Sequence, residues 1–126
     1  MIIGIGFDLC GIARMETQLK GGRFLARFFS LEEQAYINAR GQGAAASAAA
    51  CFSAKEAFVK ALGTGFDGIP PQDIAVIHDE KGRPGYDLRG LAKARAESLG
   101  VAHIHLSLSH EEGMAGAFCV LEGESK

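Results

Sequence analysis

The chain has 126 residues, of which 48% are apolar, and a formal net charge of −2. This length suffices for one domain with its own hydrophobic core, so we expect a single domain over residues 1–126. The slight negative charge argues against a dedicated nucleic-acid-binding protein, because no excess of cations is available to meet a phosphate backbone. No apolar run is long enough to span a bilayer, and the N-terminus lacks the features of a signal peptide. We therefore expect a cytoplasmic protein without a membrane partner.

The three cysteines, Cys10, Cys51 and Cys119, are odd in number and widely spaced. They show neither the spacing of metal ligands nor a disulfide framework. Each has apolar neighbours, so we expect buried free thiols that pack as small hydrophobic side chains, as in a reducing cytoplasm.

Local patterns predict a strand followed by helices in the first half of the chain. Residues 1–7 are apolar and rich in isoleucine, which is typical of a short buried strand ending at Asp8. Ser30 and Glu33 have the spacing of a capping box, which predicts a helix start near Leu31. An alanine-rich stretch of strong helix formers follows a glycine-containing break. The predicted helices of this half are 12–20, 31–40 and 44–62.

The second half of the chain predicts strands around one more helix. Residues 103–110 alternate strictly between polar and apolar side chains, which is the strongest strand signal in the chain. A turn over residues 79–84 contains glycine and proline. The other predicted elements are a strand at 74–78, a helix at 88–99, a final strand at 114–121 and a polar tail at 122–126. This mixture of elements predicts an α+β fold.

A glutamate and two lysines lie in the second half of the long predicted helix. Glu56 and Lys60 are four residues apart, so their side chains share one helix face and can point at one ligand. A carboxylate suits a hard divalent cation and a lysine suits a phosphate oxygen, which together indicate half of a magnesium–diphosphate site. The alternative is a surface ion pair that stabilises the helix. Against this alternative, the pair borders an apolar arc of the helix, and Lys55 lies inside that arc.

A Gly63-Thr64-Gly65 turn follows the long helix directly. Such a turn can present backbone N–H groups to an anion. Gly63 alone is also explained by the left-handed conformation that commonly ends a helix.

Asp8 follows the apolar residues of the first strand. A carboxylate at a strand end is usually solvated or caps a turn. Gly4 and Gly6 favour a functional role, because glycines weaken a strand and are tolerated where something approaches the backbone closely. Asp8 is thus a candidate for the missing half of the metal site.

Polar side chains end the alternating strand at Ser107, Ser109 and His110. His110 could bind a phosphate oxygen, act as a base or cap the strand end, whereas His103 and His105 are expected to face solvent. The chain contains no Gly-x-Ser-x-Gly hydrolase motif and no Gly-x-x-x-x-Gly-Lys-Ser/Thr phosphate loop.

The segment 14–27 is locally basic. Arg14, Lys20, Arg23 and Arg27 stand against one acidic residue, Glu16. This surface suits an acidic partner.

Three motifs in this order resemble those of the holo-acyl-carrier-protein synthases, the small bacterial class of 4′-phosphopantetheinyl transferases. They are Gly-Ile-Gly-Phe-Asp-Leu at 4–9 followed by Ile12 and Arg14, the segment 52–65 around Lys-Glu-Ala, and Leu-Ser-Leu-Ser-His at 106–110. The resemblance covers nearly the whole chain. It implies a mainly antiparallel sheet packed against a long central helix, and a homotrimer with active sites at the subunit boundaries.

The resemblance also implies an activity. The enzyme would move the phosphopantetheine arm of coenzyme A onto a serine of apo acyl carrier protein, release adenosine 3′,5′-bisphosphate and support fatty acid biosynthesis. Asp8 and Glu56 would bind Mg²⁺, and Lys60 would hold the diphosphate. The group that takes the serine proton stays open between a metal-bound water, Glu56 and His110.

The family pattern assigns further residues to the coenzyme and the carrier protein. The residues that would contact coenzyme A are Lys60, Gly63, Thr64, Gly65, Arg83, Pro84, Ser109 and His110. The residues that would dock the acidic carrier protein are Arg14, Arg23, Phe24 and Arg27.

The chain departs from the family pattern at one position. Many relatives have an arginine before the aromatic residue that here is Phe52, whereas this chain has Cys51. If that arginine contacts the 3′-phosphate of coenzyme A, another cation must do so here. Two other classes stay open from the residues alone: a non-catalytic module that binds coenzyme A or acidic proteins, and a magnesium-dependent nucleotide hydrolase.

Overall fold

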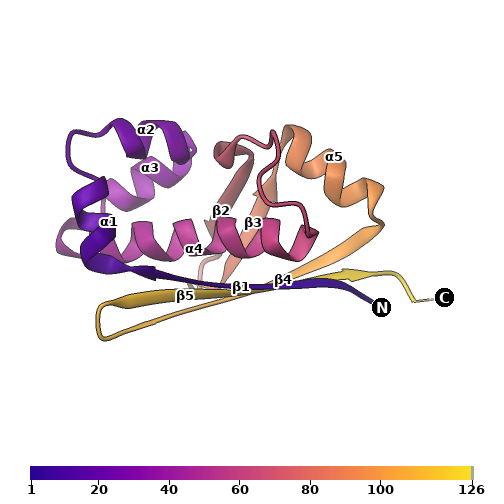
Figure 1. Cartoon of the computed structure of the whole chain (residues 1–126). Helices are drawn as coiled ribbons and strands as arrows, with labels where there is room; N and C mark the ends of the chain where they lie inside the picture. Colours follow the sequence, from indigo (N-terminus) through magenta and orange to yellow (C-terminus); the bar gives the residue numbers. More distant parts are fainter. Residues whose placement is uncertain (126) are drawn as a thin grey trace.

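The computed structural model describes residues 1–125. Three long antiparallel strands form a sheet in the order β1-β5-β4, and the labelled helices all lie on one side of it (Figure 1). The strands of this sheet are β1 Ile2–Gly11, β4 Val101–Glu111 and β5 Met114–Gly123. No helix or strand of residues 1–125 covers the other face of the sheet (Figure 1).

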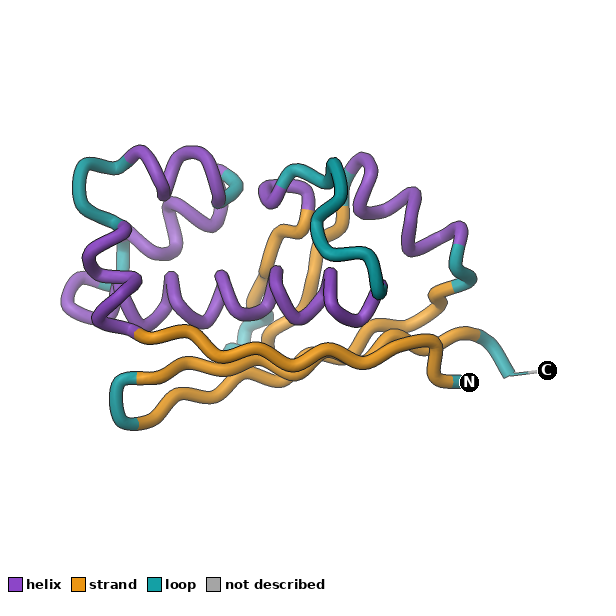
Figure 2. The backbone as a smooth tube through the Cα atoms, viewed as in Figure 1, coloured by secondary structure: helices purple, strands orange, loops and turns teal. Residues whose placement is uncertain are grey.

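The long helix α4, Ala44–Leu62, runs along the covered face of the sheet and packs on β1 and β5 (Figure 2). An antiparallel hairpin of β2, Ile74–His78, and β3, Pro84–Leu88, forms a second small sheet beside α4. The remaining helices are α1 Ile12–Gln18, α2 Arg23–Phe28, α3 Leu31–Asn38 and α5 Gly90–Ser98. The α+β class, the antiparallel pairing and the long central helix are as predicted.

Two glycines of β1 let this strand approach α4 at backbone distance. A side-chain carbon on Gly6 would overlap the carbonyl oxygen of Ala57, and one on Gly4 would overlap that of Ala61. The close approach that these glycines predict is therefore made to the α4 backbone. It places the inward-facing side chains of β1 directly against the helix.

The ends of several elements differ from the prediction. β1 continues to Gly11, so Asp8 lies within the strand, because β5 pairs with β1 as far as Met114. The strand β3 was not predicted, since Pro84 and Gly85 disfavour a strand interior. Pro84 is the first residue of β3 and pairs with His78. The helix α5 consequently begins at Gly90, two residues later than expected.

Two other local predictions, the capping box and the buried free thiols, are confirmed. The hydroxyl of Ser30 accepts a hydrogen bond from the N–H of Glu33, whose carboxylate accepts one from the N–H of Ser30, which completes the capping box at the start of α3. The three cysteines are buried and free. Within residues 1–125, no helix is both long and apolar enough to cross a bilayer.

Lys55 has a structural role that the sequence did not predict. Its ammonium donates hydrogen bonds to Glu33 Oε1 at 2.7 Å and to the carbonyl oxygens of Pro71 and Ile74 at 2.9 and 2.8 Å. Glu33 Oε2 accepts a further hydrogen bond from the N–H of Val76. Both charged side chains are almost fully buried. This pair ties α4 to α3 and β2, so Lys55 does not belong to the wall of the proposed metal site.

Candidate active site

Asp8 and Lys60 meet where β1 crosses α4. Lys60 Nζ donates a hydrogen bond to Asp8 Oδ1 at 3.0 Å and another to the carbonyl oxygen of Phe7 at 3.2 Å. The Asp8 side chain is only 13% exposed, whereas that of Lys60 is 52% exposed. A fixed carboxylate thus stands beside an ammonium that solvent and ligands can reach.

Glu56 lies one helical turn before Lys60, and it is close enough to Asp8 for the charge of Asp8 to affect its pKa. Burial raises the pKa of Glu56, the negative charge of Asp8 raises it further, and the ammonium of Lys60 opposes both. Two carboxylates that repel each other in a half-buried place favour a bound cation. The structure therefore brings together Asp8, Glu56 and Lys60, as the sequence predicted.

The second carboxylate oxygen of Asp8 gives a direct test of whether a metal ion fits. Asp8 Oδ2 is buried and has no hydrogen-bond partner among the described residues. An unpaired buried carboxylate oxygen costs free energy, and a hard cation would satisfy it. Within residues 1–125 no three His, Cys, Asp or Glu side chains are arranged so that they could hold a metal ion by themselves. Mg²⁺ typically takes one or two protein carboxylates and completes its shell with water and phosphate oxygens, so the residues present fit this ion.

The backbone N–H groups of the turn after α4 cap the end of this helix. Gly63 adopts φ 83° and donates its N–H to the carbonyl oxygens of Lys60 and Val59, and the N–H of Gly65 also reaches Val59. The N–H groups of both glycines are therefore used internally. Thr64 is exposed between them.

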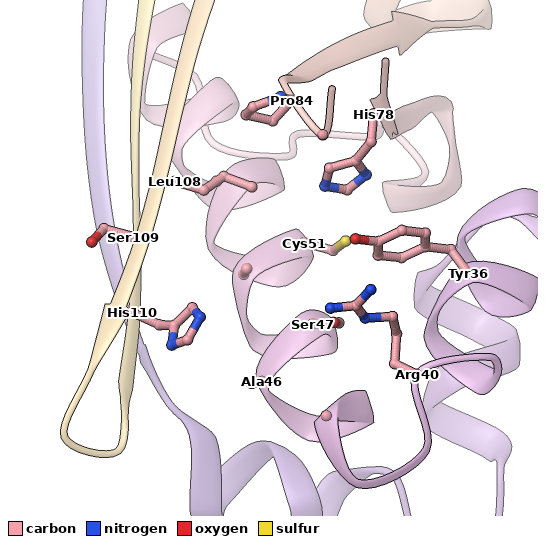
Figure 3. A pocket seen from close by; sticks show the side chains of 13 residues that line it. Tyr36, Arg40, Ala46, Ser47, Cys51, His78, Pro84, Leu108, Ser109 and His110 are labelled. Atoms are coloured by element: carbon pink, nitrogen blue, oxygen red, sulfur yellow. The ribbon is translucent and has the colours of Figure 1, made fainter. Parts of the chain in front are cut away.

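A separate cavity of about 400 Å³ lies on the other flank of α4 (Figure 3). His110 points into it from β4, whereas the side chain of Ser109 points away from it, as strand alternation requires. Pro84 lies at its rim on the hairpin of β2 and β3, and Arg83 instead lines a neighbouring hollow with other residues of that hairpin. Cys51, which stands where many relatives have arginine, forms part of the cavity wall.

Several residues of this cavity were not predicted from the sequence. Tyr36 reaches it from the last turn of α3, Arg40 from the turn just after that helix, Ser47 from the first turns of α4, and His78 from the end of β2. The i, i+4 spacing of Tyr36 and Arg40 was the one available signal. This spacing alone does not indicate a cavity, because the opposite wall is formed by the hairpin of β2 and β3.

The predicted site residues thus fall into two groups that do not share a cavity. Ser47 and Glu56 are nine residues apart on α4, about two and a half turns, so they lie on opposite sides of the helix. Asp8 belongs to β1 and His110 to β4, with β5 between them. Neither Asp8, Glu56 nor Lys60 lines the cavity that holds His110.

The predicted docking residues lie on α1 and α2. Arg23, Phe24 and Arg27 line a surface hollow beside Pro71. Burial raises the pKa of Cys10, the negative charges of Asp8 and Glu56 raise it further, and the positive charge of the exposed Arg14 opposes them. The basic surface therefore begins near the carboxylates and continues along α2.

The uncovered face of the three-stranded sheet is apolar. Strand alternation turns the side chains of β1 that do not face α4 toward this side. Ile5, Phe7 and Leu9 are 59%, 56% and 56% exposed, and Phe118 of β5 is 44% exposed. A contiguous apolar patch of this kind marks an interaction surface.

The chain resembles known proteins over nearly its whole length. A family model, the 4′-phosphopantetheinyl transferase superfamily, matches residues 4–119. A curated holo-[acyl-carrier-protein] synthase of Treponema denticola is 47% identical over 123 residues, covering 98% of this chain and 100% of that protein. The crystal structure of the Neisseria meningitidis holo-[acyl-carrier-protein] synthase is 35% identical with a TM-score of 0.86, covering 97% and 99% of the two chains. The Helicobacter pylori holo-[acyl-carrier-protein] synthase, solved in complex with coenzyme A, is 30% identical with a TM-score of 0.82 and covers 94% and 99%.

These matches show that the chain has the fold and the sequence of a 4′-phosphopantetheinyl transferase. Within that superfamily, the chain belongs to the holo-[acyl-carrier-protein] synthase family. The family membership and the enzyme class that the three motifs predict are both confirmed.

Proposed function

We propose that this protein transfers the 4′-phosphopantetheine group of coenzyme A to a serine of apo acyl carrier protein, in the cytoplasm and in support of fatty acid biosynthesis. The observation that carries the proposal is the convergence of Asp8, Glu56 and Lys60, in which Asp8 Oδ2 has no hydrogen-bond partner from residues 1–125. The similarity to a synthase solved with coenzyme A supports the choice of donor.

In the reaction, the serine oxygen forms a bond to the phosphorus that carries the pantetheine arm. The bond from that phosphorus to the bridging diphosphate oxygen breaks, and adenosine 3′,5′-bisphosphate leaves with the electron pair. Asp8 and Glu56 would hold Mg²⁺, which when bound neutralises charge on the diphosphate and polarises the attacked phosphoryl group. Lys60 balances charge on a diphosphate oxygen from its half-exposed position. The serine proton goes to Glu56, to His110 or to water.

We further propose a homotrimer in which the two groups of residues meet across a subunit boundary. In one chain they flank α4 on opposite sides, and the apolar sheet face is uncovered. A neighbouring subunit docked on that face would complete the coenzyme site. The residues proposed to contact coenzyme A there are Lys60, Gly63, Thr64, Gly65, Arg83, Pro84, Ser109 and His110.

The proposed docking surface for the carrier protein is the basic segment of α1 and α2. Arg14, Arg23 and Arg27 are exposed, and Phe24 lies half-buried among them. An acidic carrier protein would be attracted to this surface, and the attraction would weaken with salt.

Mass spectrometry of apo carrier protein before and after incubation tests the function. With coenzyme A and Mg²⁺, the wild-type protein is expected to add the phosphopantetheine mass, and Asp8→Ala and Glu56→Ala are expected to abolish the addition. Glu97→Ala, an exposed carboxylate on α5, is the matched control and should remain active.

The same assay separates the other classes of function. Release of nucleotide without carrier protein would identify a hydrolase. Binding of coenzyme A without any mass change would identify a non-catalytic module. Unchanged turnover in both carboxylate variants would refute the mechanism proposed for Asp8 and Glu56.

A further inference from the structure

A cluster of phenylalanine rings joins the proposed carrier-docking helix α2 to the long helix α4. The ring of Phe28 in α2 stacks on that of Phe24, with centroids 5.2 Å apart, and on that of Phe52 in α4, with centroids 4.9 Å apart. Phe28 also lines the hollow beside Pro71 at which the docking residues of α2 lie. This aromatic cluster is therefore part of the surface proposed to dock the carrier protein.

One further ring of the aromatic cluster belongs to the turn after α4. Phe66 follows the Gly63-Thr64-Gly65 turn, and its ring meets that of Phe28 edge-on, with centroids 5.8 Å apart and an angle of 75° between their planes. Edge-to-face packing of this kind is a preferred arrangement of aromatic rings. A direct contact thus connects the docking helix with the turn that is proposed to contact coenzyme A.

Phe66 is the packed residue of an otherwise exposed segment. The other residues from 63 to 68 are all exposed, whereas Phe66 is half-buried. The chain reverses at Asp67 and Gly68, whose φ angles are 35° and 82°. Asp67 is 73% exposed and lies 3.7 Å from Arg95 of α5, so this ion pair contributes little. Beyond the hydrogen bonds that end α4, the position of the turn therefore depends on the Phe66 ring.

The docking helix is short and packs only shallowly. α2 has six residues, none of which is buried, and it follows Gly21 and Gly22, whose φ angles are 83° and 77°. Elements with few buried contacts open at a low cost in free energy. A docked carrier protein would cover α2 and restrict its motion. Because Phe28 packs on Phe66, the same event would restrict the turn.

We propose that Phe66 is a positioning residue that couples docking of the carrier protein to binding of coenzyme A. This inference rests on the proposed transferase function. With the carrier docked, the turn is already ordered, so coenzyme A loses less conformational entropy of the protein when it binds. By linkage, coenzyme A strengthens binding of the carrier by the same factor. Phe66 itself acts through the turn and through Phe28.

Calorimetry measures this coupling at equilibrium. A carrier protein whose acceptor serine is replaced by alanine binds without being modified, so the affinity for coenzyme A can be measured with and without it. The wild type is expected to bind coenzyme A at least about 5-fold more tightly when this carrier is saturating. Phe66→Leu keeps an apolar side chain and removes the ring contact, so most of this factor should be lost. Its affinity for the carrier alone should not change, because Phe66 does not line the docking hollow.

A second ligand and a control variant exclude other causes. Adenosine 3′,5′-bisphosphate keeps one phosphate of the diphosphate and lacks the pantetheine arm, so contact between the arm and the carrier cannot strengthen its binding. Its binding should show the same coupling and the same loss in Phe66→Leu. Phe58→Leu is the matched control: Phe58 is fully buried on α4, and its ring packs on Tyr86 of β3. This variant should lose stability and keep the coupling.

The outcomes separate this inference from the function on which it rests. A wild-type protein that does not transfer phosphopantetheine to the unaltered carrier protein would refute the proposed function. If transfer occurs, equal affinity for coenzyme A with and without the carrier would refute the role of Phe66 alone. A Phe66→Leu variant that keeps the wild-type factor, or a Phe58→Leu variant that loses as much of it, would do the same.

Discussion

Gly6 of β1 lies against the carbonyl oxygen of Ala57 in α4, at a distance that leaves no space for a side-chain carbon. Gly4 has the same relationship to Ala61 one helical turn further on. Because Asp8 faces α4 two residues after Gly6, this spacing decides how closely Asp8 approaches Glu56 and Lys60. The glycines therefore link the packing of the core to the geometry of the proposed metal site.

Gly6→Ala is expected to lower both stability and transfer activity. The added methyl group must push β1 away from α4, which should cost about 1–3 kcal/mol of unfolding free energy and separate Asp8 from Glu56. Urea denaturation measures the first effect, and the Mg²⁺ concentration for half-maximal transfer measures the second. Gly85→Ala is the control, because its methyl group would meet Ile77 at an ordinary 3.9 Å. A Gly6→Ala variant with wild-type stability would show that the strand adjusts freely.

The buried pair of Lys55 and Glu33 yields a prediction about stability alone. Lys55→Met leaves Glu33 charged, buried and short of one partner, so unfolding free energy should fall by about 3–5 kcal/mol. Replacing both residues by apolar ones of similar volume should cost less than the single change, because no unpaired charge is left. Chemical denaturation of Lys55→Met, of a variant with only Glu33 replaced and of the variant with both replaced measures the coupling between the two side chains. Additive losses would mean that the two side chains act independently.

Lys60 is expected to matter for catalysis and very little for folding. Its ion pair with Asp8 is half-exposed, and such pairs contribute about 0–1 kcal/mol. Lys60→Ala should therefore unfold near the wild-type midpoint while kcat/KM falls about 100-fold or more, by analogy with the loss of one charge-stabilising donor at a reacting centre. Steady-state kinetics and thermal denaturation on the same preparation separate the two effects. A large loss of stability with unchanged kcat/KM would reverse the assignment.

The sequence predicted the part of the site that depends on local geometry. Glu56 and Lys60 share a helix face because of their spacing, and the two glycines of β1 predicted a close neighbour for that strand. The buried ion pair of Lys55 could not be predicted, because its partner Glu33 is 22 residues away in the chain and a helical wheel contains no information on such partners. The extent of β1 depended in the same way on the length of β5, which pairs with it from the far end of the chain.

The cavity residues could not be predicted for a related reason. Tyr36 and Arg40 lie at and just after the end of α3, whereas His78 ends β2, and no sequence pattern relates the first two residues to the third. They meet because β2 and β3 form a hairpin opposite α3, and β3 itself was missed at Pro84 and Gly85. Long-range pairing, rather than local propensity, builds this half of the proposed site.

Phe7→Asp should dissociate the proposed trimer without unfolding the chain. Phe7 is 56% exposed on the uncovered sheet face, so a charge there would be solvated in a monomer and buried in an interface, where it is costly. Light scattering should report a monomer, with a wild-type circular dichroism spectrum and little transfer activity. Leu31→Asp, which places the same charge at an exposed position on α3, should leave the assembly intact. A Phe7→Asp variant that keeps both its oligomeric state and its activity would place the interface elsewhere.

Subunit mixing tests whether Asp8 and His110 serve one active site from different chains. Asp8→Ala and His110→Ala are each expected to be nearly inactive alone. In randomly mixed trimers of the two variants, about a quarter of the boundaries should pair an intact Asp8 with an intact His110, so co-expression should restore about that share of the activity. A mixture of Asp8→Ala and Glu56→Ala is the matched control and should stay inactive, because both residues belong to the same side of the boundary. Failure of the first mixture to recover, in preparations where differently tagged subunits co-purify, would place the whole site within one chain.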